Sequence, residues 1–349
     1  MRFCILLSGF LIFGCHIYAQ QDRAFYRMMF WNTENFFDTR NDSLVNDEEF
    51  LPGGERYWTP KRYQLKLQHT FKVIAAVGGW EPPAVIGLCE VENRKVLNDL
   101  YYGTPLCKFP YGIVHKESPD KRGIDVAMLY RKDRLRLIRA RWFRVDFEES
   151  PGETTRDLLY AMLVPANDTL MLDTLHVFVN HWPSRSGGQS ESDHKRLTVA
   201  RLLRSKIDSL MQGSPQAKVV ITGDFNDEPS DYSVSGGLGA CSVKKKSDTC
   251  RLVNLSSVFM DDARTGTHKF DGNWSVLDQF IVSGAMLKDE SGFACTPADA
   301  HIFSAPFILV NDENGLGKRP FRTYDGYRYA GGFSDHLPVF LDLYYGRAQ

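Results

Sequence analysis

The chain has 349 residues, of which 43% are hydrophobic and 24% are charged, a composition typical of a globular protein with a large core. This composition excludes an intrinsically disordered chain. The formal net charge is −1, so the protein is not built to hold long polyanions by charge alone, although nucleic acid stays among the substrates considered.

The first 19 residues have the order of a secretory signal. Met1 and Arg2 precede an apolar run from Phe3 to Phe13, and small residues follow at Gly14 and Ala19. The run is about half as long as a membrane-spanning helix. We therefore predict that residues 1–19 are a signal peptide.

Two processing outcomes compete at this signal. Cleavage after Ala19 gives a soluble periplasmic or secreted protein, whereas lipidation at Cys15 would tether it to a membrane. Phe13 fits a lipoprotein signal poorly, so we favour release. No Pro/Gly/Ser-rich linker interrupts residues 20–349, and we expect them to form a single domain without an obligate protein partner, as a monomer.

Short apolar runs recur along the chain, and nearly all stop at a polar residue. They predict core strands with functional ends. Two stretches, 63–76 and 192–211, have helical periodicity instead, and Gly213 and Pro215 end the second. The predicted strands are Met28–Trp31, Ala84–Cys89, Ile124–Tyr130, Val177–Val179, Val219–Thr222, Val276–Val282 and Leu337–Leu343.

Seven basic residues lie between Arg131 and Arg144, a run that is more often a solvated strand face than a binding patch. Removal of the signal leaves five cysteines without a Cys-x-x-Cys pair, which argues against zinc-finger and redox motifs. Cys241 and Cys250 could close a small disulfide loop in an oxidising compartment, or both could be free thiols.

Residues suited to metal and phosphate chemistry directly follow the first two predicted strands. Asn32 follows Trp31, and Glu90 follows Cys89. A hard cation such as Mg²⁺ takes oxygen ligands and keeps several waters, so one carboxylate and one amide oxygen are a sufficient share from the protein. Taken singly, each residue could equally cap a strand or occupy a turn.

A third group, Thr222-Gly223-Asp224-Phe225-Asn226-Asp227, follows another apolar run. We expect Gly223 to let the backbone turn, so that Asp224 and Asn226 point the same way. A carboxylate there can hold or deprotonate water, and the amide can donate a hydrogen bond to a phosphoryl oxygen. An isolated Asx-turn is the alternative interpretation.

Two histidines and a buried acid complete the candidates. His336 follows Asp335, and an adjacent acid can fix the tautomer of an imidazole and stabilise its charged form. His181 in Asn180-His181-Trp182 is a weaker candidate. Asp278 places a charge inside an apolar strand, and a buried carboxylate needs a partner that the other site residues could supply.

Arg122 precedes a predicted strand and Arg185 follows His181. Either guanidinium matches the geometry of a phosphate group and could clamp the substrate phosphate, with plain surface charge as the alternative.

The ordered set Trp31-Asn32, Glu90, Gly223-Asp224-Phe225-Asn226, Leu277-Asp278 and Ser334-Asp335-His336 resembles the endonuclease/exonuclease/phosphatase superfamily, which includes deoxyribonuclease I, exonuclease III, sphingomyelinases and inositol-polyphosphate phosphatases. The resemblance extends over residues 26–345. It implies an α+β fold of the deoxyribonuclease-I-like kind, an α/β four-layer sandwich of two packed mixed β-sheets flanked by helices, with the site along one edge.

The resemblance also implies roles for the candidate residues. Glu90, with Asn32 nearby and Asp278 completing the shell, would bind Mg²⁺, for which Mn²⁺ could substitute. Asp224 and Asn226 would orient the attacking water and the phosphate, and either Asp224 or His336 would act as base. Asp335 would support His336, while His181 would stabilise the phosphoryl oxygens.

These expectations describe an exported, Mg²⁺-dependent phosphoesterase in which water attacks the phosphate in line, without a covalent enzyme intermediate. No Gly-x-Ser-x-Gly motif supports a nucleophilic serine. The substrate is a phosphate ester, either a diester as for a nuclease or general phosphodiesterase, or a small phosphorylated molecule or phospholipid headgroup as for a phosphatase. A non-catalytic surface-binding module on the same scaffold is the alternative of another class.

Overall fold

The computed structural model describes residues 23–347, except 149, 169–172, 186–187, 248–249, 289–290 and 314. The predicted signal peptide, residues 1–19, and its Cys15 lie outside the described residues. None of the helices in the described part of the chain is long and apolar enough to cross a membrane.

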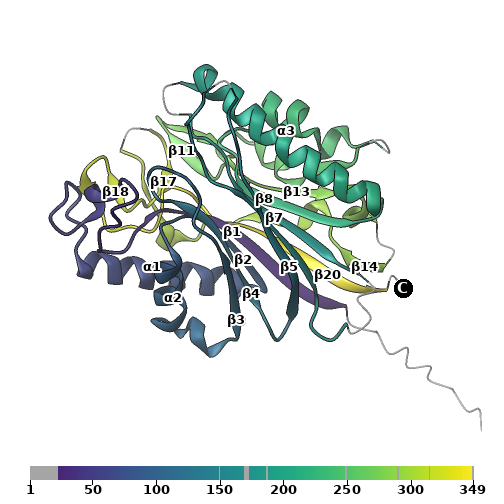
Figure 1. Ribbon diagram of the computed structural model, residues 1–349, viewed down its shortest axis with the longest axis horizontal. Coiled ribbons are helices and arrows are strands. Elements are labelled where there is room, and N and C mark those ends of the chain that lie inside the picture. The colour runs from purple at the N-terminus through teal and green to yellow at the C-terminus, as the bar shows by residue number, and fades with distance from the viewer. Residues whose placement is uncertain are drawn as a thin grey trace, which may run out of the picture.

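Two mixed sheets form the centre of the protein (Figure 1). The first has the order β14-β20-β1-β2-β4-β3, with β15 also pairing with β20. β1 and β2 are parallel, and β20 runs antiparallel to β1, so strands from the two ends of the described chain are neighbours. Its strands are β1 (Ala24–Phe36), β2 (Val85–Val91), β3 (Tyr111–His115), β4 (Asp125–Arg131), β14 (Ser291–Ala294), β15 (Ala300–Ile302) and β20 (Val339–Arg347).

The second sheet has the order β5-β6-β7-β8-β13-β10-β9. β7 and β8 are parallel, whereas β13 runs antiparallel to β8. Its strands are β5 (Leu135–Phe143), β6 (Leu158–Pro165), β7 (Leu175–His181), β8 (Lys218–Asp224), β9 (Ala240–Ser242), β10 (Leu252–Asn254) and β13 (Asp278–Ser283).

Three α-helices among the described residues cover the outer faces of the two sheets. α1 (Pro60–Gly78) and α2 (Arg94–Tyr102) pack on the first sheet in one hydrophobic cluster, and α3 (Gln189–Gly213) packs on the second sheet in another. A third cluster fills the space between the sheets. In Figure 1, α3 and the pair α1 and α2 accordingly lie on opposite sides of the molecule. The order helix, sheet, sheet, helix confirms the predicted four-layer sandwich.

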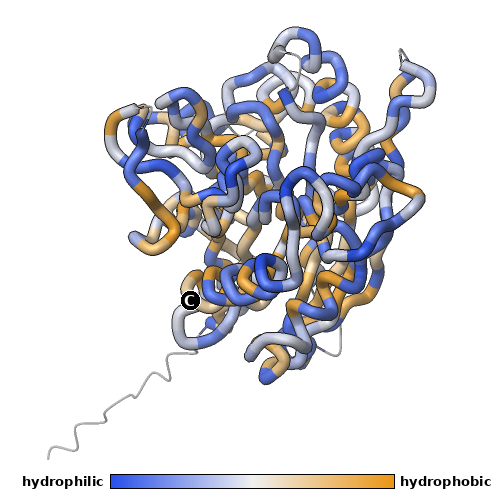
Figure 2. Tube along the Cα trace, turned by 90° about the vertical axis from the view of Figure 1, so that its left-hand side faces the viewer, coloured by the Kyte–Doolittle hydropathy of each residue, from blue (hydrophilic) through white to orange (hydrophobic). Residues whose placement is uncertain are grey.

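The layers follow from the sequence pattern. Strands that are covered on both faces need apolar residues at successive positions, as in β2 and β8, where nearly every residue is buried. Thr59 caps α1 by accepting a hydrogen bond from the Arg62 backbone N–H, and Pro60 occupies its first position. In Figure 2, hydrophobic and hydrophilic residues are interleaved along the coloured part of the trace.

Each predicted strand and helix is present, and β1 extends well beyond the predicted Met28–Trp31 at both ends. The elements that were not predicted include α2, β3, β5 and β6, together with the short strands and short helices. β5 contains part of the basic run, and its residues alternate between exposed and partly buried, as on a solvated strand face. Arg131 pairs with Asp133, and Arg144 with Asp146, which leaves these two charges locally neutralised.

Short elements surround the sheets. The hairpins are β11 (His268–Phe270) with β12 (Asn273–Ser275), β16 (Leu309–Asn311) with β17 (Lys318–Pro320), and β18 (Tyr324–Asp325) with β19 (Arg328–Tyr329). The short helices are η1 (Glu48–Phe50), η2 (Pro105–Lys108), η3 (Ser233–Leu238), η4 (Val243–Lys245), η5 (Leu255–Asp261), η6 (Gly284–Leu287), η7 (Pro297–Asp299) and η8 (Pro306–Ile308).

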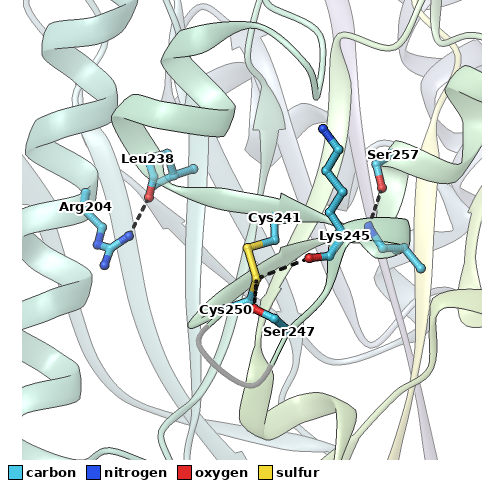
Figure 3. Close-up of a disulfide and its surroundings, with 8 residues drawn as sticks. Arg204, Leu238, Cys241, Lys245, Ser247, Cys250 and Ser257 are labelled. Atoms are coloured by element: carbon cyan, nitrogen blue, oxygen red, sulfur yellow. Dashed lines mark hydrogen bonds between the residues drawn. A yellow bond between two sulfur atoms is a disulfide. The ribbon is translucent and has the colours of Figure 1, made fainter.

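Cys241 and Cys250 form a disulfide, which ties β9 to the segment before β10 (Figure 3). Of the two alternatives left open by the sequence, the structure has the bridge. Cys89, Cys107 and Cys295 are free thiols, and burial raises the pKa of the Cys295 thiol to about 12. A thiol in that state is unreactive.

Candidate active site

The polar residues that end the central strands of both sheets lie at one edge of the sandwich. Because β1 and β2 are parallel, Asn32 and Glu90 emerge at the same end of the first sheet. In the second sheet, His181 of β7, Asp224 of β8 and Asp278 of β13 are register partners in one row. Residues opposite one another on neighbouring strands point to the same face, so this row presents an imidazole and two carboxylates together.

The first sheet is irregular where it contributes to the site. The register between β1 and β2 shifts between Asn32 and Phe36, and the register between β2 and β4 shifts around Glu90. Glu34, Asn35 and Glu90 have φ of 51°, 53° and 57°. Each such conformation costs on the order of 1 kcal/mol for a residue with a side chain. These bulges turn Glu90 so that its Oε2 accepts a hydrogen bond of 2.8 Å from the Asn35 backbone N–H.

Asp224 lies at the centre of the site and is almost fully buried. Its Oδ2 accepts a hydrogen bond of 3.0 Å from Asn32 Nδ2. The same oxygen lies 3.7 Å from His181 Nε2 and 3.8 Å from His336 Nε2. Burial raises the pKa of the Asp224 carboxyl to about 7. A carboxylate with that pKa is a competent proton acceptor near neutral pH.

His336 is held by groups from two distant segments and by its near neighbour Ser334. Its Nδ1 lies 2.7 Å from Asp278 Oδ2, its backbone carbonyl accepts 2.9 Å from Trp31 Nε1, and its backbone N–H donates to Ser334 Oγ at 3.0 Å. Ser334 Oγ also donates to the Asn32 carbonyl at 2.7 Å. The last segment of the chain is thereby fastened to β1 and β13, which fixes the ring.

The carboxylate that supports His336 is Asp278 and not its neighbour Asp335. Asp335 Oδ2 instead lies 3.6 Å from Arg322 Nη2. Asp335 keeps a carboxylate oxygen within 4.8 Å of a His336 ring nitrogen, so its contribution to the ring is electrostatic, while the antiparallel pairing of β13 with β8 brings Asp278 into hydrogen-bond distance. Asp278 has the buried partner that its apolar surroundings required.

The surroundings shift the pKa values of the two histidines in opposite directions. Although burial opposes charge on His336, Asp278 and Asp224 beside it raise its pKa well above the ordinary value, which favours the charged ring. Burial, together with the nearby Arg156 and Arg122, lowers the pKa of His181 well below the ordinary value. This shift favours the neutral ring of His181, whose Nε2 lies 3.7 Å from Asp224 Oδ2 and 4.0 Å from Glu90 Oε1.

Asn226 follows Asp224 with a φ of 51° and donates its backbone N–H to Asp224 Oδ1 at 2.9 Å. Its Nδ2 donates to the Trp182 carbonyl at 3.0 Å. We expected Gly223 to let the backbone turn. It lies instead inside β8. A side chain there would clash with the carbonyl oxygen of Asn180, so glycine is needed for the close approach of β7 and β8.

The two arginines expected to bind phosphate lie beside the site in different settings. Arg122 is about half exposed, with Nε 3.5 Å from Asp120 Oδ1, and its charge reaches His181. Arg185 Nε donates to the Asn226 carbonyl at 2.7 Å, and its Nη2 lies 2.9 Å from Asp231 Oδ2. Arg185 therefore fixes the loop that contains Asn226.

The donor set fits a divalent metal ion. Asp224, Asp278 and His336 offer ligand atoms that all lie within 4.8 Å of one another. Glu90 keeps Oε1 facing the same space, since only its Oε2 bonds to the Asn35 N–H. Carboxylate oxygens are the ligands that hard cations prefer. Glu90 Oε1 is thus left to hold the ion, and Asp278 Oδ1 is buried without a hydrogen-bond partner among the described residues. Both oxygens of Asp224 already accept hydrogen bonds, from Asn32 and from the Asn226 backbone.

Several further residues that shape the site were not predicted from the sequence. Glu34 accepts the backbone N–H groups of Thr323 and Tyr324 at 2.6 and 3.1 Å, and Lys66 Nζ donates to Thr323 Oγ1 and the Phe333 carbonyl, both at 2.7 Å. The ring of His268 lies 4.7 Å from that of His336. The roles of Glu34, Lys66 and His268 depend on contacts with residues far along the chain, and no local sequence motif predicts these contacts.

Known proteins share this fold. The sequence model of the endonuclease/exonuclease/phosphatase family matches residues 27–345. A search of curated proteins finds no match. Humanised D. rerio TDP2 is 13% identical with a TM-score of 0.54, covering 91% of this chain and 98% of that one. A family protein from Bacteroides thetaiotaomicron is 18% identical with a TM-score of 0.53, covering 93% and 99%.

The catalytic domain of human Nocturnin is 14% identical with a TM-score of 0.52, covering 92% of this chain and 97% of that one. The TM-scores of these three structures show a shared fold. The family match spans nearly the whole described chain. The chain belongs to the endonuclease/exonuclease/phosphatase family, and it has the fold of that family's metal-dependent phosphoester hydrolases.

Proposed function

We propose that this protein is an exported, Mg²⁺-dependent phosphodiesterase in which water attacks the phosphorus directly. The observation that carries the proposal is the buried row Asp278, His336 and Asp224, in which one imidazole bonds to a carboxylate on one side and faces a second carboxylate on the other. One acid holds the cation, and the other is left to accept a proton.

Asp224 is the base in this mechanism. His336 is already protonated, because its two neighbouring carboxylates raise its pKa, and it cannot accept another proton. Asp224 Oδ2 therefore orients the attacking water and takes its proton, while the backbone N–H of Asn226 holds the other carboxylate oxygen. Of the two candidate bases, the protonation states favour Asp224.

The remaining polar groups stabilise charge on the phosphoryl oxygens. His336 and His181 each present Nε2 to the space around Asp224 Oδ2. Donors fixed in advance in a buried site stabilise developing charge without reorganisation. Mg²⁺ held by Glu90, with Asn32 nearby, would polarise a phosphoryl oxygen and offset the negative charge of the site.

Charge favours a diester over a monoester. Glu90, Asp224 and Asp278 are three carboxylates, and the His336 cation with one Mg²⁺ balances them. The site then has no surplus positive charge for the phosphate, and binding without one costs more for the two negative charges of a phosphomonoester than for the single charge of a diester. TDP2 from D. rerio has been crystallised with a single-strand DNA product, which makes a phosphodiester a reasonable probe for this chain.

Two observations support export. The order of the first 19 residues is that of a secretory signal. The Cys241–Cys250 disulfide is typical of proteins that fold in an oxidising compartment.

The test is hydrolysis by residues 20–349 of bis-p-nitrophenyl phosphate, p-nitrophenyl phosphate, single-stranded DNA and phospholipids, in EDTA and then in Mg²⁺ or Mn²⁺. We expect turnover of diesters in the presence of metal, and its loss in Glu90→Gln and Asp224→Asn. Asp261→Asn, a change at an exposed acid that pairs with Lys244, is the matched control and should keep full activity.

Preference for p-nitrophenyl phosphate or a phospholipid headgroup would move the assignment to a phosphatase or a lipid phosphoesterase. Absence of metal-dependent turnover with every substrate would favour the surface-binding module instead.

A further inference from the structure

A second polar cavity lies next to the active site. It has a volume of about 360 Å³ and is lined by residues that precede β4, by the segment before β6, by the residues after His181 and by α3. The residues that matter for its chemistry are Arg122, Thr154, Thr155, Arg156, Ser184 and Lys195. None of the roles proposed above uses this cavity as a binding site.

One carbonyl oxygen joins the cavity to the catalytic residues. Arg156 Nη2 donates to the Trp182 carbonyl at 2.6 Å, and Asn226 Nδ2 donates to the same oxygen at 3.0 Å. Arg156 and Asn226 therefore lie within hydrogen-bond distance of a single atom. A group bound in the cavity would be close to a phosphate held by Asn226.

The cavity has buried donors without partners. The hydroxyl oxygens of Thr154 and Thr155 and the Nε of Arg156 are buried, and none has a hydrogen-bond partner among the described residues. Thr155 and Arg156 are 3% and 5% exposed. A buried polar group that lacks a partner costs about 1–3 kcal/mol. Three such atoms around one cavity indicate that a ligand supplies the missing acceptors.

The charge of the cavity selects the sign of that ligand. Among the described residues that line the cavity, Arg122, Arg156 and Lys195 face two carboxylates, Asp120 and Glu153. Asp120 is shared, because it accepts from Arg156 at 2.9 Å and lies 3.5 Å from Arg122 Nε, while Lys195 pairs with Glu153 at 2.5 Å. One positive charge is in surplus, and hydroxyl and guanidinium donors match the oxygens of a phosphate.

We propose that this cavity binds a second phosphate group of the substrate, one short linker away from the phosphate that is cleaved. The proposal rests on the phosphodiesterase function proposed above and specifies its substrate class, a molecule with two neighbouring phosphates. The second phosphate belongs either to the next diester of a nucleic acid strand or to a terminal phosphomonoester.

The test compares three chromogenic esters with the same scissile bond: the p-nitrophenyl ester of thymidine 5′-phosphate with a free 3′-hydroxyl, with a 3′-phosphate, and with a 3′-methyl phosphate. We expect a second phosphate to raise kcat/KM at least tenfold. The ester with the 3′-methyl phosphate should have the higher kcat/KM if the cavity binds a neighbouring diester. The ester with the free 3′-phosphate should have the higher kcat/KM if the cavity binds a terminal monoester.

Thr155→Val and Lys195→Met test the cavity itself, since the first keeps the side-chain shape and the second affects a partly exposed residue. Both should lower the ratio of kcat/KM between the esters with and without a second phosphate at least fivefold. Arg201→Met removes an exposed charge from the same helix and should leave the ratio unchanged. Equal rates for all three esters in the wild type would overturn the proposal while leaving the phosphodiesterase assignment intact.

Binding of inorganic phosphate in EDTA, measured by calorimetry, makes the proposal testable without turnover. We expect saturable binding that is weakened at least tenfold in Lys195→Met and Thr155→Val but not in Arg201→Met. Binding that is absent, or that these two substitutions leave unchanged, would overturn the second phosphate site whatever the enzyme hydrolyses.

Discussion

His336 Nδ1 lies 2.7 Å from Asp278 Oδ2, although 58 residues separate them in sequence. This bond fixes which ring nitrogen points to Asp278, so that Nε2 faces the substrate space. We expect Asp278→Asn to reduce kcat by about 100-fold or more, because an amide no longer stabilises the imidazolium. Asp335→Asn, which removes a different acid next to His336, should reduce kcat by less than about tenfold. Steady-state kinetics of the two variants decide, and equal losses would contradict the pairing.

The pH profile should report Asp224. Burial raises the pKa of this carboxyl to about 7, and only the ionised form can accept a proton from water. We expect kcat/KM to fall as the pH decreases through about 7 at limiting Mg²⁺. Because a nearby cation favours the ionised carboxylate, saturating Mg²⁺ should move the midpoint to lower pH. A profile that is flat between pH 5.5 and 8 would exclude Asp224 as the base.

Lys66 and Glu34 fasten the segment that leads to His336. Both side chains are buried, and both bond to residues of this segment, meeting at Thr323. Lys66→Met should lower the free energy of unfolding by about 3 kcal/mol, because it leaves Glu34 as an uncompensated buried charge. Adding Glu34→Gln should restore part of that loss. Urea unfolding of the two single variants and the double variant measures the coupling, and strict additivity would show that the two groups act independently.

Stability should fall in acid because of His176. Burial lowers the pKa of this ring to about 4, and its two nitrogens lie 2.8 Å from Tyr160 Oη and 3.0 Å from Thr174 Oγ1. Its pKa in the unfolded chain is about 6.5, so below that pH the unfolded chain binds a proton that the folded protein does not. The stabilisation is complete above pH 6.5 and decreases as the pH falls to 4, by about 3 kcal/mol in total.

The measurement is the free energy of unfolding against pH for the wild type and for His176→Gln. The difference between the two proteins should change across this pH window and be constant above it. Parallel curves would assign the acid sensitivity to other groups.

The sequence predicts the fold and the site well where a residue's role depends on its own surroundings along the chain. Asn32, Glu90, Asp224 and Asp278 each end or begin an apolar strand, and parallel pairing brings such ends to one edge. Proximity in sequence suggested Asp335 as the acid that supports His336, whereas the acid within hydrogen-bond distance of the ring is Asp278. Asp278 was identified as a buried charge in need of a partner, but which partner it takes depends on the pairing of β13 with β8.

Other residues gave no local signal. The structural role of Lys66 depends on its hydrogen bond to Thr323, 257 residues away. The bulge at Glu90 depends on strand register rather than on any glycine or turn residue. Strands β5 and β6 were missed because β5 is an edge strand whose alternating arginines resemble a solvated surface.

The hydrogen bond from Trp31 to the carbonyl of His336 spans 305 residues, and β20 lies directly beside β1. The catalytic groups consequently assemble only after the last strand has been synthesised. A fragment that ends before Ser334 contains Asn32, Glu90, His181, Asp224 and Asp278 but lacks His336 and its bond to Trp31, so we expect it to have no activity.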